Sequence, residues 1–357
     1  MKRLVIAVGI MLLFSVKCFG TADVMSAAEE MYPYLGEDGS DAARHAENGE
    51  GFDLNRGLSR VIGICSENFM PLLFAGIKTA AKLMLCVLLI SLADSLFFRG
   101  KGSGALDIAA TAAIAMTGLG DVTSLLNVAI GHQNRLSEFS KILLPFLTAA
   151  GAASGRGGES IMLQSGIAMF CDLAVSAFSG LYIPFIFAYI ALGLGGSLCE
   201  NSMISKLGDW LKNFVNGGIR IFMTLFLGYM TISGAAGRAA DSLALRSAKT
   251  AAASVPYIGG VASEAADAVV AGASVMKGYL GVFGTVGILG SAVVPLLSCG
   301  LGWGCVKLAS MLASGFSRGE KAVAIMADAM GLVFAMCAAS TFLMLLALTV
   351  CVNTVSV

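Results

Sequence analysis

Residues 323–352 read VAIMADAMGLVFAMCAASTFLMLLALTVCV, an apolar run in which Asp328 is the one charged residue. A bilayer core about 30 Å thick needs about 20 such residues in a helix, so this run is long enough to cross a membrane. Hydrophobic residues make up 57% of the chain and charged residues 13%, with a mean hydropathy of +0.83. A soluble protein could not carry this composition without a large exposed apolar surface. The sequence therefore predicts an all-α, polytopic helical membrane protein.

Similar Gly- and Ala-rich apolar segments fill most of residues 71–357, the predicted helical transmembrane domain. The length that a membrane requires divides them into about eight transmembrane helices. The expected spans lie near residues 71–98, 105–131, 139–154, 160–179, 182–199, 217–236, 279–313 and 323–352. The run 279–313 suits either a tilted helix or a helix broken at Pro295.

Residues 1–20 have the pattern of a secretory signal peptide. Lys2 and Arg3 precede an apolar run from Leu4 to Val16, and cleavage is expected after Gly20. An uncleaved anchor is one alternative, and lipidation at Cys18 is another, although Lys17 is a poor residue before a lipidated cysteine. Either way, the segment that follows is expected outside the cytoplasm.

Residues 21–70 are predicted to form an acidic extracytoplasmic arm and a membrane-proximal segment. Nine Asp and Glu residues and one Arg give residues 21–53 a net charge of −8. Such a segment buries too little apolar surface to fold alone, so we expect a solvated, disordered arm. Its charge either recruits a basic partner or only keeps the arm soluble.

The loops between the predicted spans follow the positive-inside rule at four places. If the chain starts outside, the cytoplasmic loops contain Arg99 and Lys101, then Arg156, then Lys206 and Lys212, then Arg318 and Lys321. The same walk places residues 237–277 outside, although they contain several bases. Either this region is an exception to the rule, or it does not lie free in solution.

The region 235–277, between the sixth and seventh predicted spans, has the periodicity of an amphipathic helical hairpin. Polar residues occupy an arc of roughly 140° on each of two short helices, which a turn after Pro256 separates. Folding back would bring Lys249 opposite Asp267, and Asp241 within a turn of Lys277. An ordinary solvated loop with incidental charges is the alternative.

Signals for catalysis or for a cofactor are weak in this chain. Residues 315–319 match G-x-S-x-G, but they join two apolar helices where a nucleophile elbow needs a strand before the serine. His45 and His132 are the two histidines, and the sequence has no Walker A motif. The nine cysteines lack C-x-x-C spacing. We therefore expect a non-enzymatic protein without a metal or another cofactor.

Charged residues inside the predicted spans are costly enough to be informative. Lys78, Asp94 and Asp328 are expected near helix ends, where they can reach the membrane surface. Charges deeper in the membrane would border an aqueous path in a channel subunit, or converge on one site in a permease. These in-span charges are Lys78, Lys82, Asp94, Asp121, Asp172, Arg220, Lys307 and Asp328.

Glycine recurs at every third position from residue 278 to residue 290. In an α-helix this row winds by about 60° per step, which suits either close packing against crossing helices or a flexible segment near a gate. The row consists of Gly278, Gly281, Gly284, Gly287 and Gly290.

The order and spacing of short elements between residues 225 and 277 resemble the signature region of the stage III sporulation protein AE family. These elements are Phe226-Leu227-Gly228, Ser233-Gly234-Ala235, Ala240-Asp241, Leu245-Arg246-Ser247-Ala248-Lys249, Val255-Pro256-Tyr257-Ile258-Gly259, Ala266-Asp267 and Ala273-Ser274. Weaker similarity, including Leu144-Pro145, extends over most of residues 54–357. The residues assigned to the family signature and to assembly are Gly234, Asp241, Arg246, Lys249, Pro256, Gly259, Asp267 and Lys277.

The resemblance implies an integral, multi-pass subunit of the channel complex that joins the mother cell to the forespore during endospore formation. It places the chain in the mother-cell membrane around the forespore. The implied partners are an ATPase, ring-forming proteins and small membrane proteins of the same operon, and a protein of the forespore membrane. A polytopic solute permease unrelated to sporulation is the alternative function.

The hairpin predicts the effect of exchanging charges. Lys249→Glu and Asp267→Lys should each weaken assembly of the complex by about 0.5 to 2 kcal/mol, because each places like charges together. The double exchange should recover part of the loss, and co-purification of partners at equal protein levels measures it. A double variant no better than the worse single variant would show that these residues do not pair.

Overall fold

The computed structural model describes residues 21–48, 51–98, 104–153, 157–199, 202–253, 259–315 and 319–353, although the side chains of residues 233–277 lie outside the described set. The N-terminal part consists of α2 (Thr21–Ala46), the two-residue strands β1 (Glu47–Asn48) and β2 (Gly51–Phe52), which pair antiparallel, and α3 (Leu54–Ala93) with its π-helical end η1 (Asp94–Phe98). The remaining elements are α4 (Gly104–Ala153), α5 (Gly157–Ala177), η2 (Phe178–Tyr182), α6 (Ile183–Cys199), α7 (Ser202–Ala253), α8 (Gly259–Ala313) and α9 (Glu320–Asn353). The predicted signal peptide, residues 1–20, lies outside the described residues.

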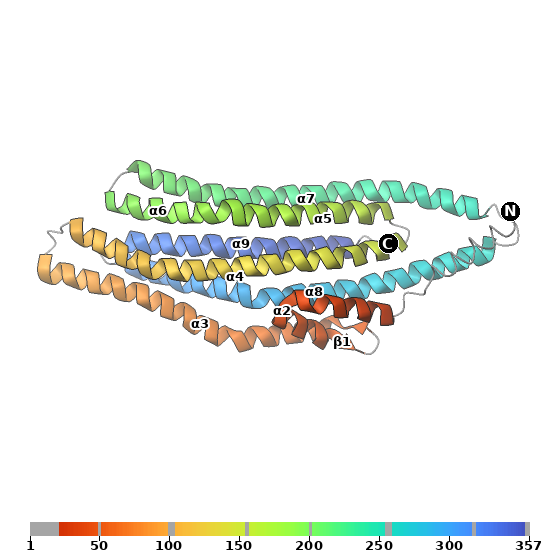
Figure 1. Cartoon of the computed structure of the whole chain (residues 1–357), viewed down its shortest axis with the longest axis horizontal. Helices are drawn as coiled ribbons and strands as arrows, with labels where there is room; N and C mark the ends of the chain where they lie inside the picture. Colours follow the sequence, from red (N-terminus) through yellow and green to blue (C-terminus); the bar gives the residue numbers. More distant parts are fainter. Residues whose placement is uncertain are drawn as a thin grey trace.

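The long helices of the described chain form one elongated bundle and alternate in direction (Figure 1). Helices α5 and α6 join end to end through η2 and act as a single rod. The end of α3 with η1, the ends of α6 and α8, and the starts of α4, α7 and α9 lie at one end of the bundle (Figure 1). We call it the basic end after the Lys and Arg residues near these positions in the sequence. Helix α2, the ends of α4, α7 and α9, and the starts of α5 and α8 lie toward the other end, the α2 end (Figure 1).

Several of these helices are much longer than a membrane is thick. Helix α4 has 50 residues, α7 has 52 and α8 has 55. At 1.5 Å per residue they are about 75 to 83 Å long, more than twice the thickness of a bilayer core. A membrane can therefore enclose only part of the bundle.

An apolar belt marks the part of the bundle that faces lipid. In water such a belt would be an exposed patch far larger than a monomeric soluble protein carries, whereas in a bilayer it is solvated. Its side chains lie mostly in the half toward the basic end, and they include Phe74, Leu85, Leu89, Leu92, Met116, Leu207, Phe214, Ile221, Leu308 and Leu312.

The described residues contain five helices that are long and apolar enough to cross a membrane. These are Leu54–Leu96, Ile108–Ala149, Gly180–Leu198, Gly278–Ala313 and Glu320–Val352. The helical, polytopic fold class is thus confirmed, whereas the count of eight spans is not.

Helix α4 corrects one part of the predicted topology. This single helix contains both the second and the third expected spans, 105–131 and 139–154. The polar stretch between them stays helical, and part of it packs against other helices. In that stretch Arg135 lies against Gly36 of α2. Helix α4 therefore runs as one element from the basic end to the α2 end, and Arg156, which the sequence placed in a cytoplasmic loop, lies outside the described residues.

The acidic segment also differs from its prediction. It is helical from Thr21 to Ala46, and Met31, Leu35 and Ala42 bury one apolar face against the bundle. Gly36, at a φ of 74°, lets the helix kink so that both of its parts stay in contact. The expectation of a disordered arm was wrong. It assumed that the segment would have to fold by itself, whereas α2 buries its apolar face against α3, α4 and α8.

The glycine row of α8 creates the space for these contacts. A Cβ atom at Gly281 would meet Val352 of α9, one at Gly284 would meet Leu143 of α4 and Leu348 of α9, and ones at Gly287 and Gly290 would meet α2. The winding of the row sends successive glycines toward different neighbours. The row is therefore a packing surface, and the ring of Phe283 beside it makes edge-on or tilted contacts with the rings of Tyr32, Phe52 and Phe139.

The continuity of α4 predicts the location of three reporter fusions. Fusions at residues 40 and 155 should both report an extracytoplasmic position, whereas a fusion at residue 102 should report a cytoplasmic one. Paired reporters that are active on opposite sides of the membrane measure this. Cytoplasmic activity at residue 155 together with residue 102 would contradict a single membrane crossing by α4.

Candidate functional site

Three helices meet at a charged cluster inside the apolar belt, which we call the Asp328 cluster and define as Lys212, Lys307 and Asp328. One carboxylate oxygen of Asp328 on α9 accepts from Lys212 Nζ of α7 at 2.7 Å, and the other accepts from Lys307 Nζ of α8 at 2.8 Å. All three side chains are largely buried, with exposed fractions of 21% for Asp328 and about a third for each lysine. A single carboxylate thus joins α7, α8 and α9.

A cavity of about 480 Å³ opens beside this cluster, between α6, α7 and α9. Asp328 and Tyr189 lie along it, and Ser197, Ser205 and Lys321 lie nearer the basic end. Glycines widen it: Gly193, Gly196 and Gly208 contribute no side chains to its wall. Close packing of α6 on α7 at Gly193 and Gly208 holds the two helices together on this side.

The cluster revises what the sequence predicted for its members. Asp328 was expected to reach the membrane surface, but it lies eight residues into α9 and pairs with two lysines because a lone charge there is costly. Lys307 was recognised as an in-span charge, whereas Lys212 was assigned to a cytoplasmic loop. The opposite charges of Lys307 and Asp328 were a signal for this pairing, but no pattern in the sequence indicated the register that brings Lys212 to them.

Other polar and charged residues inside the bundle also form ion pairs or hydrogen bonds between helices. Lys82 of α3 lies 3.9 Å from Asp121 of α4, and Lys141 of α4 lies 3.3 Å from Asp172 of α5. His132 of α4, fully buried, hydrogen-bonds through Nε2 to the Thr341 hydroxyl of α9 at 2.8 Å. These polar contacts connect neighbouring helices within an otherwise apolar interior.

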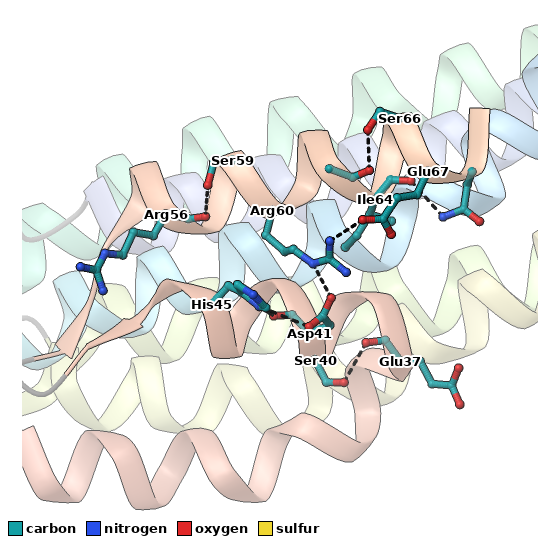
Figure 2. A network of polar contacts seen from close by, with 12 residues as sticks. Glu37, Ser40, Asp41, His45, Arg56, Ser59, Arg60, Ile64, Ser66 and Glu67 are labelled. Carbon is teal, nitrogen blue, oxygen red and sulfur yellow. Dashed lines mark hydrogen bonds and ion pairs between the residues drawn. The ribbon is translucent and has the colours of Figure 1, made fainter. Parts of the chain in front are cut away.

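A second polar network holds α2 against α3 (Figure 2). Arg60 of α3 lies between two carboxylates and donates from Nε to Asp41 and from Nη1 to Glu67, both at 2.6 Å. Asp41 also lies 3.2 Å from the ring of His45, one turn along α2. Arg60 therefore joins the acidic segment to the first long helix of the bundle.

Burial changes the acid–base behaviour of α2. The pKa of Tyr32 is raised well above its usual range, first by burial and then by the hydrogen bond that its hydroxyl donates to Glu47 at 2.8 Å. The pKa of Asp38 is also raised, by burial and by the neighbouring Glu37. Arg44 packs over the Tyr32 ring at 5.0 Å. Helix α2 is thus a packed element of the fold.

The residues assigned to the family signature cannot be placed in the same detail. Helix α7 carries Gly234, Asp241, Arg246 and Lys249, and α8 carries Gly259, Asp267 and Lys277, with all their side chains outside the described set. Pro256 lies in the segment 254–258, which is also outside the described residues. The ends of α7 and α8 that flank it lie at the same end of the bundle (Figure 1). The amphipathic hairpin and its charge pairing remain predictions.

The described residues offer no group of three His, Cys, Asp or Glu side chains positioned to hold a metal ion. Several of their charged side chains instead form ion pairs between helices. This arrangement joins helices to one another.

The long apolar helices, their lipid-facing belt and the paired charges inside it define a polytopic helical membrane protein. The sequence model of stage III sporulation protein AE matches residues 57–355. The chain belongs to the stage III sporulation protein AE family, and its membership connects it with sporulation.

A curated relative gives the same family. Stage III sporulation protein AE of Bacillus subtilis (strain 168) is 24% identical over 173 residues, which cover 48% of this chain. The match spans 43% of that relative's length, less than half of it. No solved structure gives a significant match to the chain.

The Asp328 cluster predicts an order of stabilities. Asp328→Asn should lower the free energy of unfolding by about 1 to 3 kcal/mol, because it leaves two largely buried lysines facing each other. Lys212→Met and Lys307→Met should each cost less, since each leaves one intact pair. Thermal unfolding of the purified protein in detergent measures the order.

The matched control is Lys206→Met, which removes an exposed lysine from the same helix as Lys212. It should leave the unfolding temperature within about a degree of the parent, because exposed charges contribute little. Equal losses for Asp328→Asn and for the two lysine variants would show that the cluster does not act as a three-membered unit.

Proposed function

We propose that this protein is an integral membrane subunit of the channel complex that connects the mother cell with the forespore during endospore formation. Membership of the stage III sporulation protein AE family is the observation that carries the proposal. The fold supports it, because a bundle whose longest helices run about 75 to 83 Å has a membrane-enclosed part and a part left to contact other proteins. The site of action is the mother-cell membrane that surrounds the forespore.

The part of the bundle toward the α2 end fits the proposed assembly. If the membrane covers the apolar belt near the basic end, about half the length of α8 lies beyond it on the extracytoplasmic side. That half would face the space between the two membranes. The proposed partners are ring-forming proteins and small membrane proteins of the same operon, together with a protein of the forespore membrane.

The proposed role is non-enzymatic. Energy would come from a partner ATPase at the cytoplasmic side, since the sequence has no Walker A motif. The basic end, which the distribution of Lys and Arg predicts to be cytoplasmic, is the surface that such an ATPase would approach.

A solute permease is the second candidate, and the Asp328 cluster favours it. Paired charges beside a cavity inside one chain are what a permease site would contain. The two candidates differ in assembly, because a permease works as a single protein or a simple oligomer. Cross-linked co-purification from sporulating cells separates them: recovery of the operon partners supports the channel, and an isolated protein active in solute uptake supports the permease.

Deletion of the gene tests the proposed function in the cell. Engulfment should proceed largely unchanged, while the enclosed forespores shrink or lose late gene expression, because the channel is required after enclosure. Fluorescence microscopy of membranes and of a late forespore reporter measures both effects. Complementation with the parent gene is the control, and a normal spore yield without the gene would contradict the proposal.

A further inference from the structure

A second cavity, of about 370 Å³, lies between α3 and α8, and we call it the α3–α8 groove. Leu73 of α3 lines one side, and residues of α8 between Gly300 and Leu308 line the rest. Leu308 is 63% exposed and belongs to the apolar belt. The groove therefore opens on the surface that faces lipid.

A glycine leaves this groove unfilled. A Cβ atom at Gly304 would meet no atom within 4 Å, whereas one at Gly300, a turn earlier, would lie 3.2 Å from the Phe334 ring of α9. From Gly281 to Gly290 the absent side chains of α8 make room for neighbouring helices. The absent side chain of Gly304 instead leaves space that a ligand can occupy.

Lys307 supplies the charge of the groove. Among the described residues that line it, Lys307 is the one charged residue. Its ammonium has three N–H donors, and the contact with Asp328 at 2.8 Å uses one of them. Lys212 bonds the same carboxylate, so the Asp328 cluster holds two positive charges and one negative charge. The positive member that lines the groove is Lys307, which favours an anionic group there.

The base and the apolar wall follow one another along α8. Lys307 lies six residues before the end of this helix at Ala313, and Gly304 and Gly300 lie nine and thirteen residues before it. At 1.5 Å per residue these positions are about 9, 14 and 20 Å from the basic end. A phospholipid has the same order, with its phosphate near the membrane surface and its acyl chains deeper.

The size of the groove favours a lipid chain over a helix. An α-helix about 10 Å across fills about 420 Å³ per turn, so the groove could accommodate less than one turn. An apolar helix would also cover Lys307 without offering an acceptor, whereas a lipid phosphate offers several. A flexible acyl chain can follow a narrow apolar surface.

We propose that the α3–α8 groove binds an anionic phospholipid from the leaflet at the basic end. The lipid phosphate accepts from Lys307, and one acyl chain lies along Gly304 and Gly300, against Leu73. The inference does not depend on the identity of protein partners, so failure of the sporulation experiment leaves it standing, and the reverse also applies.

Native mass spectrometry of the purified full-length protein in detergent tests the lipid site. The protein is titrated with phosphatidylglycerol or with phosphatidylcholine of identical acyl chains. Lys307→Gln is compared with Lys212→Gln, the matched control. Each variant removes one positive charge from the Asp328 cluster and leaves one lysine on the carboxylate, but only Lys307 lines the groove.

We expect the parent protein to bind phosphatidylglycerol at least five times more tightly than phosphatidylcholine. Lys307→Gln should weaken phosphatidylglycerol binding about tenfold and remove the preference, because it removes a charge-assisted hydrogen bond. Lys212→Gln should change it less than threefold. Equal affinity of the parent for the two lipids, or equal losses in the two variants, would overturn the proposal.

A second pair of variants tests where the acyl chain lies. Gly304→Leu should weaken binding of both lipids at least fivefold, because its side chain fills the groove. Gly120→Leu on α4 is the control, since a Cβ there also meets no atom within 4 Å and Gly120 does not line the groove. Thermal unfolding checks each variant, and the lysine pair decides the question if Gly304→Leu does not fold.

Unchanged lipid binding by a folded Gly304→Leu protein would show that the groove is not the site. If that variant instead loses a dimer that the parent shows in the same spectra, a second copy of the chain occupies the groove and the proposal is wrong.

Discussion

The close approach of neighbouring helices to α8 is the constraint on which the rest of the structure depends. Between Gly281 and Gly290 this helix presents hydrogen atoms where side chains would otherwise stand, and α9, α4 and α2 occupy the space in turn. Lipid supplies no hydrophobic force between helices, so close packing and interhelical polar contacts must hold them together. The glycine row allows close packing over the middle of the bundle, and Phe283 fills the core beside it.

Toward the basic end, polar contacts between helices hold the bundle together. The Asp328 carboxylate joins α7, α8 and α9 through two lysines, and Lys82 pairs with Asp121 between α3 and α4. Each charge lowers the free-energy cost of burying its partner, a cost that would be high for either charge alone. The same carboxylate also lines a polar recess between α6, α7 and α9.

At the α2 end the paired carboxylates are more exposed than Asp328. Arg60 bridges Asp41 and Glu67, and Tyr32 bonds Glu47 beneath Arg44. An acidic helix that could not fold alone becomes part of the bundle there. The proposed channel function uses this division, with one part of each long helix in the membrane and the other available to proteins in the space beyond it.

Composition and apolar run length were sufficient to predict a helical membrane protein, and the spacing of the elements between residues 225 and 277 was sufficient to predict its family. Both are local properties, since a segment's hydropathy and a motif's spacing do not depend on what packs against them. The tertiary structure alone decided that residues 105–131 and 139–154 form one helix, because the polar stretch between them is stabilised by contact with α2. It also decided that Lys212 reaches Asp328, 116 positions away, since the register between two helices follows from packing along their whole length.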